Sequence, residues 1–156
     1  MKKIDVSISY DKVEEQELTP VEKSLLDAAR KATYRSYSPY SGFSVGAAVL
    51  LDDGTIVEGS NQENSSYPQG ICAERTAIFY AGSRYPDKKI LALCIAARGT
   101  DGSFTTLPVT PCGGCRQALL ESECRQKSPI KVVLYGIDEI YIISSAQQLL
   151  PLAFQL

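Results

Sequence analysis

Three of the five cysteines lie in two short clusters that could hold a metal ion together. Cys72 is followed by Ala73 and Glu74, and Cys112 and Cys115 are three residues apart in the run Pro-Cys-Gly-Gly-Cys. On a helix, residues at this spacing share one face, and a helix N-terminus favours thiolate. Three thiolate ligands leave the fourth position of a tetrahedral zinc ion open for water, as in catalytic sites. The spacing therefore indicates a zinc site on these three cysteines.

Glu74 could supply the proton transfers that such a site needs. It lies two residues after Cys72, so it can reach water at the open position without binding the metal. Zinc provides hydroxide near neutral pH and a carboxylate moves protons, so no imidazole is required. The chain contains no histidine, which excludes Ser-His-Asp and Cys-His catalysis and any histidine-ligated metal.

Two other interpretations of the cysteines remain open. A closed zinc knuckle would need a fourth thiolate from Cys94 or Cys124. Cys94 lies within an apolar run and suits a core position, and Cys124 lies roughly 14 Å of helical rise beyond Cys115. A redox pair at Cys112 and Cys115 is the other possibility, but thioredoxin-type pairs normally lack a third cysteine with a neighbouring glutamate.

The composition is typical of an ordinary globular chain and excludes several classes of binding partner. The 156 residues are 44% hydrophobic and carry a net charge of -2. The sequence has no cluster of basic residues of the kind that binds nucleic acid, and no apolar stretch in it approaches membrane-spanning length. The N-terminal residues lack the apolar core of a signal peptide. We therefore expect a cytoplasmic, reducing location, in which cysteines act as ligands and not as disulfides.

The elements that must position these residues follow from periodicity and helix-start signals. Alternating apolar residues predict a strand at residues 4–10, and residues 11–18 form an acidic linker. Thr19 with Glu22 predicts a capping box that starts a helix. Further strands are expected at residues 43–51, 55–60, 90–97, 132–135 and 139–143, and further helices at 71–84, 111–123 and 145–150.

This order of elements predicts an α/β fold with three layers, α-β-α, around a mixed central sheet of about five strands. We expect residues 1–18 to be an N-terminal strand or extension and residues 19–156 to form one zinc-dependent domain. Both cysteine clusters open a predicted helix, so the two helix starts must come together.

Several motifs in order along the chain resemble those of zinc-dependent nucleoside deaminases. Cys-Ala-Glu-Arg at 72–75 and Pro-Cys-Gly-Gly-Cys-Arg-Gln at 111–117 match the metal signature, including its three-cysteine variant. Residues 37–48, 61–67 and 149–154 are similar to the family's first strand, ribose-binding segment and C-terminal motif. The chain resembles the small, homotetrameric three-cysteine form of cytidine deaminase over nearly its whole length.

The resemblance implies a reaction and a cofactor. One Zn²⁺ per subunit would be held by Cys72, Cys112 and Cys115, and zinc-bound hydroxide would attack C4 of cytidine or deoxycytidine. Glu74 would shuttle protons to the ring and then to the departing amine. The products would be uridine or deoxyuridine and ammonia, which is the chemistry of pyrimidine salvage.

The resemblance also implies which residues contact the substrate. Asn61 and Glu63 would bind the ribose hydroxyls, and the backbone around Ala73 would read the cytosine edge. Phe43 would lie against the substrate ring, although a core aromatic at a strand start is as good an interpretation from sequence alone.

Two more aromatic residues would belong to sites shared within a homotetramer. Phe154 resembles the aromatic that reaches a neighbouring subunit's site, and Tyr67 lies in a segment near subunit contacts. Simple helix packing and an ordinary loop tyrosine are the alternatives. The loops at 98–110 and 122–130 are longer than the family's usual connections.

Arg75 has a predicted role that follows from charge. Three thiolates give the zinc cluster a net charge of -1, which weakens the metal's pull on its water. A guanidinium beside the sulfurs would offset that loss; the alternative is a solvated surface arginine. Arg116 and Gln117 also match the family motif, and the sequence gives them no specific role.

Two functional alternatives remain. One keeps the chemistry and changes the substrate to blasticidin S, a nucleotide or a nucleic acid. Asn61 with Glu63 favours a free nucleoside, because a carboxylate at the ribose would repel a phosphate. The other is a non-catalytic zinc-stabilised binding module, which would have no need of Glu74 beside an open coordination position.

Overall fold

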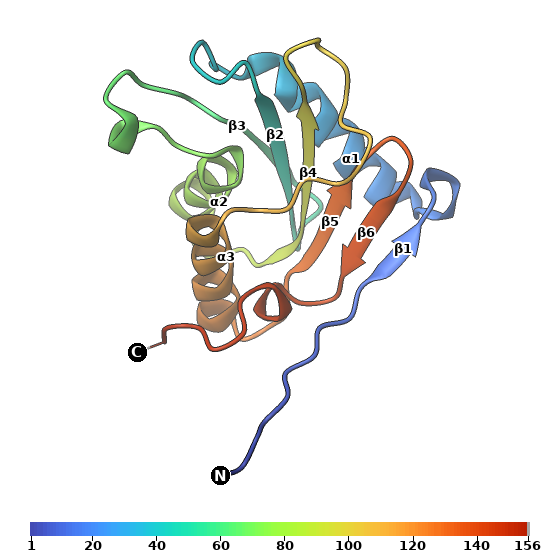
Figure 1. The fold of residues 1–156 in the computed structure, drawn as a ribbon, viewed down its shortest axis with the longest axis vertical. Helices are drawn as coiled ribbons and strands as arrows, with labels where there is room; N and C mark the ends of the chain where they lie inside the picture. Colours follow the sequence, from blue (N-terminus) through green and yellow to red (C-terminus); the bar gives the residue numbers. More distant parts are fainter. Residues whose placement is uncertain (156) are drawn as a thin grey trace.

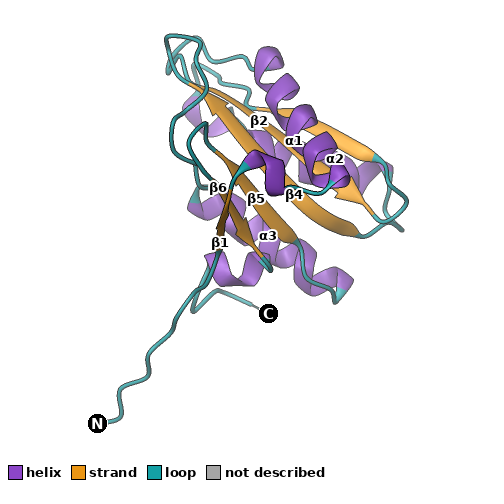
Figure 2. Ribbon diagram, turned by 90° about the vertical axis from the view of Figure 1, so that its right-hand side faces the viewer, coloured by secondary structure: helices purple, strands orange, loops and turns teal. Residues whose placement is uncertain are grey.

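A mixed six-stranded sheet forms the middle of three layers in the computed structural model, which describes residues 1–155 (Figures 1 and 2). The strand order is β1-β6-β5-β4-β2-β3. The strands are β1 (Asp11–Val13), β2 (Ser44–Leu51), β3 (Ile56–Ser60), β4 (Ile90–Arg98), β5 (Lys131–Tyr135) and β6 (Ile140–Ile143), and the helices are α1 (Pro20–Ala32), α2 (Ala73–Arg84) and α3 (Gly113–Gln126). The predicted three-layer α/β fold is confirmed, with six strands in place of about five.

The strand directions in the sheet require a long connection between β4 and β5. β4 and β5 are parallel, and every other pair of neighbouring strands is antiparallel. A parallel pair needs a crossover connection, and α3 provides it. The two cysteine-bearing helices, α2 and α3, cover one face of the sheet, while α1 covers the other (Figure 2).

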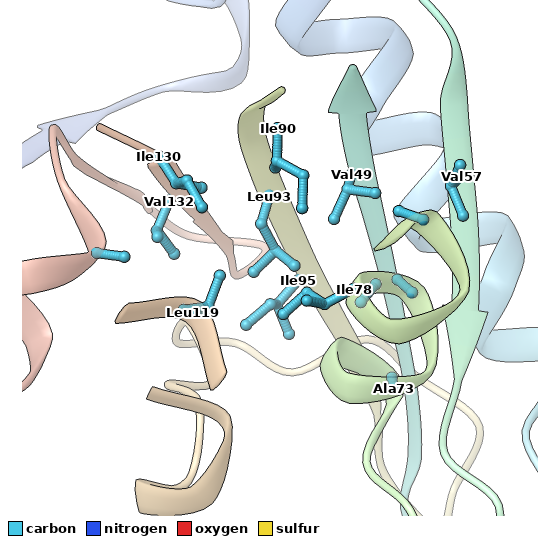
Figure 3. Close-up of a cluster of buried hydrophobic side chains, with 14 of the residues drawn as sticks. Val49, Val57, Ala73, Ile78, Ile90, Leu93, Ile95, Leu119, Ile130 and Val132 are labelled. Carbon is cyan, nitrogen blue, oxygen red and sulfur yellow. The ribbon is translucent and has the colours of Figure 1, made fainter. Parts of the chain in front are cut away.

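The larger core fills the space between the sheet and the face of α2 and α3 (Figure 3). Leu93 and Ile95 from β4 meet Ile78 of α2 and Leu119 of α3, and all four are buried. Burying such side chains contributes about 1.5–3 kcal/mol each. Both helices are therefore fixed to the sheet, and their first turns are held with them.

Gly59 on β3 allows α2 to approach the sheet closely. A Cβ at this position would lie 2.5 Å from the carbonyl oxygen of Ala73 and 2.5 Å from the amide nitrogen of Ala77. Any larger residue would push the first turn of α2 outward. This contact matters because the same turn carries the first cysteine cluster.

The predicted N-terminal strand is in the wrong place. Residues 4–10 form no strand, and Ile4, Val6 and Ile8 are exposed. The strand is β1, within the segment predicted to be a linker, where Asp11–Val13 pairs with Ile142–Ile140 of β6. The reason is the partner: β6 offers only a short edge, and the alternating residues project beyond the sheet as an extended arm (Figure 1).

The other predicted elements differ from the structure mainly at their ends. Thr19 caps α1, and its backbone amide and hydroxyl both donate to the Glu22 carboxylate. The predicted closing helix is a shorter 3-10 helix, Ala146–Leu149. No helix within residues 1–155 has both the length and the apolar character needed to cross a bilayer.

Candidate metal centre and active site

The three predicted cysteine ligands come together at the starts of α2 and α3. Cys72 and Cys112 are the N-cap residues of these helices, and Cys115 lies in the first turn of α3. The Sγ atom of Cys112 is 3.8 Å from that of Cys72 and 3.5 Å from that of Cys115. All three Sγ atoms lie within 4.8 Å of one another.

These distances fit one tetrahedral zinc ion. Zn–S bonds of about 2.3 Å at tetrahedral angles place ligand sulfurs about 3.8 Å apart, whereas a disulfide requires about 2.05 Å. Within the described residues neither alternative fourth ligand joins the cluster: Cys94 is fully buried in the core beneath α1, and Cys124 is exposed near the end of α3. The cluster therefore offers three ligands and an open position.

The charges around the cluster favour a thiolate at Cys72. A hydrogen bond with Cys115 and the nearby Arg75 guanidinium hold the pKa of Cys72 at about 5. The same hydrogen bond, together with burial, raises the pKa of Cys115. Cys72 thus ionises more readily than Cys115, and holding all three sulfurs as thiolates takes a cation. The N-termini of α2 and α3 add positive potential at this point.

Arg75 lies beside the first ligand, as the charge argument predicts. Its Nη2 atom is 3.8 Å from the Sγ atom of Cys72, and the thiolate raises the pKa of the guanidinium. The Nε atom of Arg75 is buried and has no hydrogen-bond partner. This geometry is compatible with charge compensation at the cluster and does not fit a freely solvated arginine.

Glu74 is buried at the edge of the cluster. Its side chain lies in the first turn of α2, and the residue is only 5% exposed. Burial raises the pKa of its carboxyl group, and the negative charge of Cys72 raises it further. A carboxyl group that holds its proton closer to neutral pH is suited to both accepting and donating it.

A cleft of about 540 Å³ opens next to Cys72. Its volume lies within the range that small-molecule sites use. The lining residues come from the loop before β2, the segment after β3 and the start of α2; they are Tyr40, Ser41, Asn61, Gln62, Glu63, Asn64, Tyr67, Gly70, Ile71, Cys72 and Arg75. Three of the predicted substrate-binding residues, Asn61, Glu63 and Tyr67, therefore share one cleft with a metal ligand.

Glu63 is held in this cleft by the loop opposite. Its Oε2 atom accepts hydrogen bonds from the backbone amides of Tyr40 at 2.9 Å and Ser41 at 3.2 Å, and the Ser41 hydroxyl donates to Oε1. The Ser41 hydroxyl, followed by these amides, lowers the pKa of the carboxyl group. Glu63 thus presents a fixed negative charge to whatever enters.

Asn61 forms part of the cleft's framework. Its Oδ1 atom accepts from the Ser36 hydroxyl at 2.6 Å and the Val45 amide at 2.8 Å, and its Nδ2 atom donates to the Phe43 carbonyl at 2.9 Å. An asparagine amide has two hydrogens, so one hydrogen remains for a ligand. The side chain ties together the two segments that flank the cleft, in addition to any contact with substrate.

The remaining predicted residues lie around the cleft in different ways. Phe43 is half-buried just before β2 and does not line the cleft. Ala73 is fully buried and does not line the cleft. Tyr67 is exposed, with its ring centroid 5.9 Å from that of Tyr40.

Phe154 lies outside the cleft altogether. It is 70% exposed and lines a second hollow, of about 680 Å³, at the outer face of α2 and α3. Arg75 lines both hollows, so the two hollows are neighbours. In a single chain, Phe154 and the nucleoside-sized cleft face different spaces.

Two residues of the site, Tyr40 and Ser41, have no functional signal in the sequence pattern. Both lie in the run Ser-Tyr-Ser-Pro-Tyr-Ser-Gly, which has the composition of a simple turn. Tyr40, and in part Ser41, bind Glu63 through backbone amides, which any residue except proline can supply. The feature of the sequence that could have indicated a site residue here is the Ser41 hydroxyl, two residues before Phe43.

The chain is similar to known deaminases in both sequence and structure. Residues 20–130 match the family model for the cytidine and deoxycytidylate deaminase zinc-binding region. The chain is 44% identical over 136 residues to a cytidine deaminase of Sporosarcina psychrophila, covering 86% of this chain and 90% of that protein. It is 39% identical over 130 residues to that of Halalkalibacterium halodurans, covering 83% and 91%.

Solved structures lead to the same group. The crystal structure of cytidine deaminase from Burkholderia pseudomallei superposes with a TM-score of 0.72 at 37% identity, covering 84% of this chain and 97% of that one. Cytidine deaminase from Mycobacterium tuberculosis gives a TM-score of 0.67 at 35% identity, with coverage of 86% and 98%. The similarity therefore extends over nearly the whole of both of those chains.

Proposed function

The chain belongs to the cytidine and deoxycytidylate deaminase family, and we propose that it hydrolyses cytidine and deoxycytidine to uridine and deoxyuridine, with release of ammonia. The observation that carries this proposal is the placement of a three-cysteine cluster and the buried carboxyl group of Glu74 beside a cleft that contains Glu63 and Asn61. Metal, proton carrier and ribose-binding groups would then serve one bound nucleoside, in the setting of pyrimidine salvage.

Cys72, Cys112 and Cys115 would hold one Zn²⁺ per subunit, because their sulfur spacing and thiolate chemistry fit that ion. When bound, the ion supplies Lewis acidity that makes water a nucleophile near neutral pH. Arg75 donates toward the Cys72 sulfur, which draws electron density from the thiolate and limits how far three negative ligands weaken that effect.

Glu74 is the proposed proton carrier. Its carboxylate takes the proton that the attacking water loses and delivers it to the pyrimidine ring. It then takes the proton of the hydroxyl group newly bonded to C4 and delivers it to the amine, which leaves as ammonia while the C4 carbonyl group forms. The raised pKa of this buried group supports both transfers, because it brings the protonated and deprotonated forms closer in free energy near neutral pH.

The cleft residues orient the nucleoside. The Glu63 carboxylate and the free amide hydrogen of Asn61 would bind the ribose hydroxyls, and the backbone at Ala73 would bind the cytosine edge. Phe43 and Tyr67 would border the ring and the sugar. The fixed charge of Glu63 supports a nucleoside substrate over a nucleotide, because it repels phosphate.

We further propose a homotetramer in which Phe154 completes a neighbouring subunit's cleft. Phe79, on α2, is also exposed and lines the same outer hollow as Phe154, and apolar groups gathered on one face favour association. Residues 1–18 would be an extension to a single deaminase domain at 19–156, and the enzyme would act in the cytoplasm.

The test is a substrate panel with metal analysis. Ammonia release is measured from cytidine, deoxycytidine, their monophosphates and blasticidin S, on protein whose zinc content and mass in solution are known. We expect turnover of both nucleosides, little turnover of the monophosphates, and one zinc per chain. Zinc without turnover of any substrate would overturn the proposal in favour of a zinc-stabilised binding module.

A further inference from the structure

The two residues that follow Cys115 both donate hydrogen bonds to the C-terminal segment. The Nη1 atom of Arg116 is 2.8 Å from the carbonyl oxygen of Leu149, and the Nε2 atom of Gln117 is 3.2 Å from the carbonyl oxygen of Phe154. These two contacts attach residues 149–154, which lie beside α3 (Figure 1), to the first turns of the metal-binding helix.

Arg116 makes a second contact that leads back to the metal ligands. Its Nε atom donates to the carbonyl oxygen of Pro111 at 2.8 Å, and Pro111 immediately precedes Cys112. A guanidinium is a rigid planar fork, so its two bonds fix each other's direction. One side chain therefore closes the metal-binding turn and holds the start of the C-terminal segment.

The segment beyond Leu149 has little burial of its own to hold it. Leu152 is 97% exposed and has a positive φ of 55°, and Phe154 is 70% exposed. The hydrogen bond from Gln117 therefore holds a segment that is mostly exposed. It does so at the backbone of Phe154 itself. This bond, together with the one from the Nε2 atom of Gln155 to the Sγ atom of Cys124 at 3.5 Å, ties residues 154 and 155 to α3.

We propose that Arg116 and Gln117 are positioning residues that hold Phe154 where a neighbouring subunit's cleft can receive it. The metal-binding helix of one subunit would thereby set nucleoside affinity in the next. This inference rests on the proposed role of Phe154 at a shared site. It gives a function to two motif residues that neither ligate metal nor line the cleft next to Cys72.

Gln117→Leu tests the proposal most directly, because leucine keeps the size of the side chain and removes its donor. We expect the KM for cytidine to rise about fivefold with kcat and zinc content unchanged, and hydrogen exchange in residues 150–155 to become faster. Gln148→Leu is the matched control: its side chain donates to the Ser144 hydroxyl at 2.8 Å and not to α3, so both readouts should stay at wild-type values.

Arg116 provides a second variant pair. Arg116→Gln should raise the KM and also release zinc faster to a chelator, because it loses both carbonyl contacts. Arg116→Lys keeps the charge and one donor direction, and should restore part of each property. Equal loss in both variants, together with a lowered Tm, would indicate a general structural role and overturn the inference.

Phe154→Ala separates this inference from the proposed function. If Phe154→Ala leaves the KM unchanged, the proposed role of Phe154 at a shared site fails, and the positioning role fails with it. If Phe154→Ala raises the KM by about tenfold or more while Gln117→Leu behaves like wild type, the shared site stands and the positioning role is overturned. A raised KM and faster exchange in both variants support the inference.

Discussion

The metal-binding region and the nucleoside cleft are built in opposite ways. The cysteine cluster and Glu74 come from the first turns of two helices that are packed against the larger core. The cleft is bounded mostly by loops, and within it Glu63 is half-buried and Tyr67 is exposed. The reacting groups are thus fixed by helices that pack against the core, whereas the binding groups are fixed by hydrogen bonds between loops.

This difference predicts two kinds of failure. A change in the cluster or at Glu74 removes a group that takes part in the reaction itself, so its effect on turnover should be large. A change in the cleft removes one of several contacts to substrate, so its effect on KM should be moderate. Variants of the two regions can test whether chemistry and binding are separated in this way.

Glu74→Gln should have the largest effect. The amide keeps the shape of the side chain and cannot carry protons, so we expect kcat to fall by about 10³-fold or more, with zinc retained and the KM little changed. Steady-state kinetics and metal analysis measure both. Glu121→Gln, at an exposed position on α3, is the control and should behave like wild type. A loss of less than about tenfold would show that another group moves the protons.

Arg75→Ala should come next. Removing the guanidinium 3.8 Å from the Cys72 sulfur leaves the thiolates uncompensated, so we expect activity or zinc affinity to fall by about 10- to 100-fold. Arg75→Lys should lie between this variant and wild type. The measurement is zinc retention against a competing chelator, in parallel with kcat. Unchanged values for both properties would remove Arg75 from the site.

The same contrast explains what could be predicted from sequence. The cluster was predictable because its signals are local: two cysteines at i and i+3, each cluster at a helix start. The role of Asn61 in the framework was not, because its partners Ser36 and Val45 lie 25 and 16 residues away. β1 was misplaced for the same reason: alternation shows that a strand is possible, but only β6 decides which residues pair.

Glu63→Gln should have a moderate effect, confined to binding. We expect the KM for cytidine to rise about tenfold, which corresponds to the loss of one hydrogen bond to a charged group, and kcat to change much less. Loss of the fixed charge should also lower discrimination against cytidine monophosphate, because phosphate is no longer repelled. Kinetics with both substrates test this. A fall in kcat as large as that of Glu74→Gln would contradict the separation of binding from chemistry.

The pKa of Glu63 adds a pH dependence to this prediction. Its folded-state pKa is lowered from the ordinary 4.5, mainly by the Ser41 hydroxyl. The carboxylate therefore stays charged through the neutral and mildly acidic range, and its contribution to binding is lost only below its ordinary pKa. We expect the KM of the wild type to show no step from this group between about pH 5 and 8. Ser41→Ala should shift the step upward in pH.

Removing residues 1–10 should have the smallest effect, because the arm is exposed and belongs to neither region. A chain that begins at Asp11 keeps the pairing of β1 with β6 and the ion pair of Lys12 with Glu139. We expect unchanged kcat, KM and zinc content, and a Tm within about 2 °C of wild type. A chain that begins at Thr19 loses β1 and the buried Leu18, and its Tm should fall by about 5 °C or more. If the shorter deletion changed the mass in solution or the KM, the arm would take part in assembly or in substrate binding.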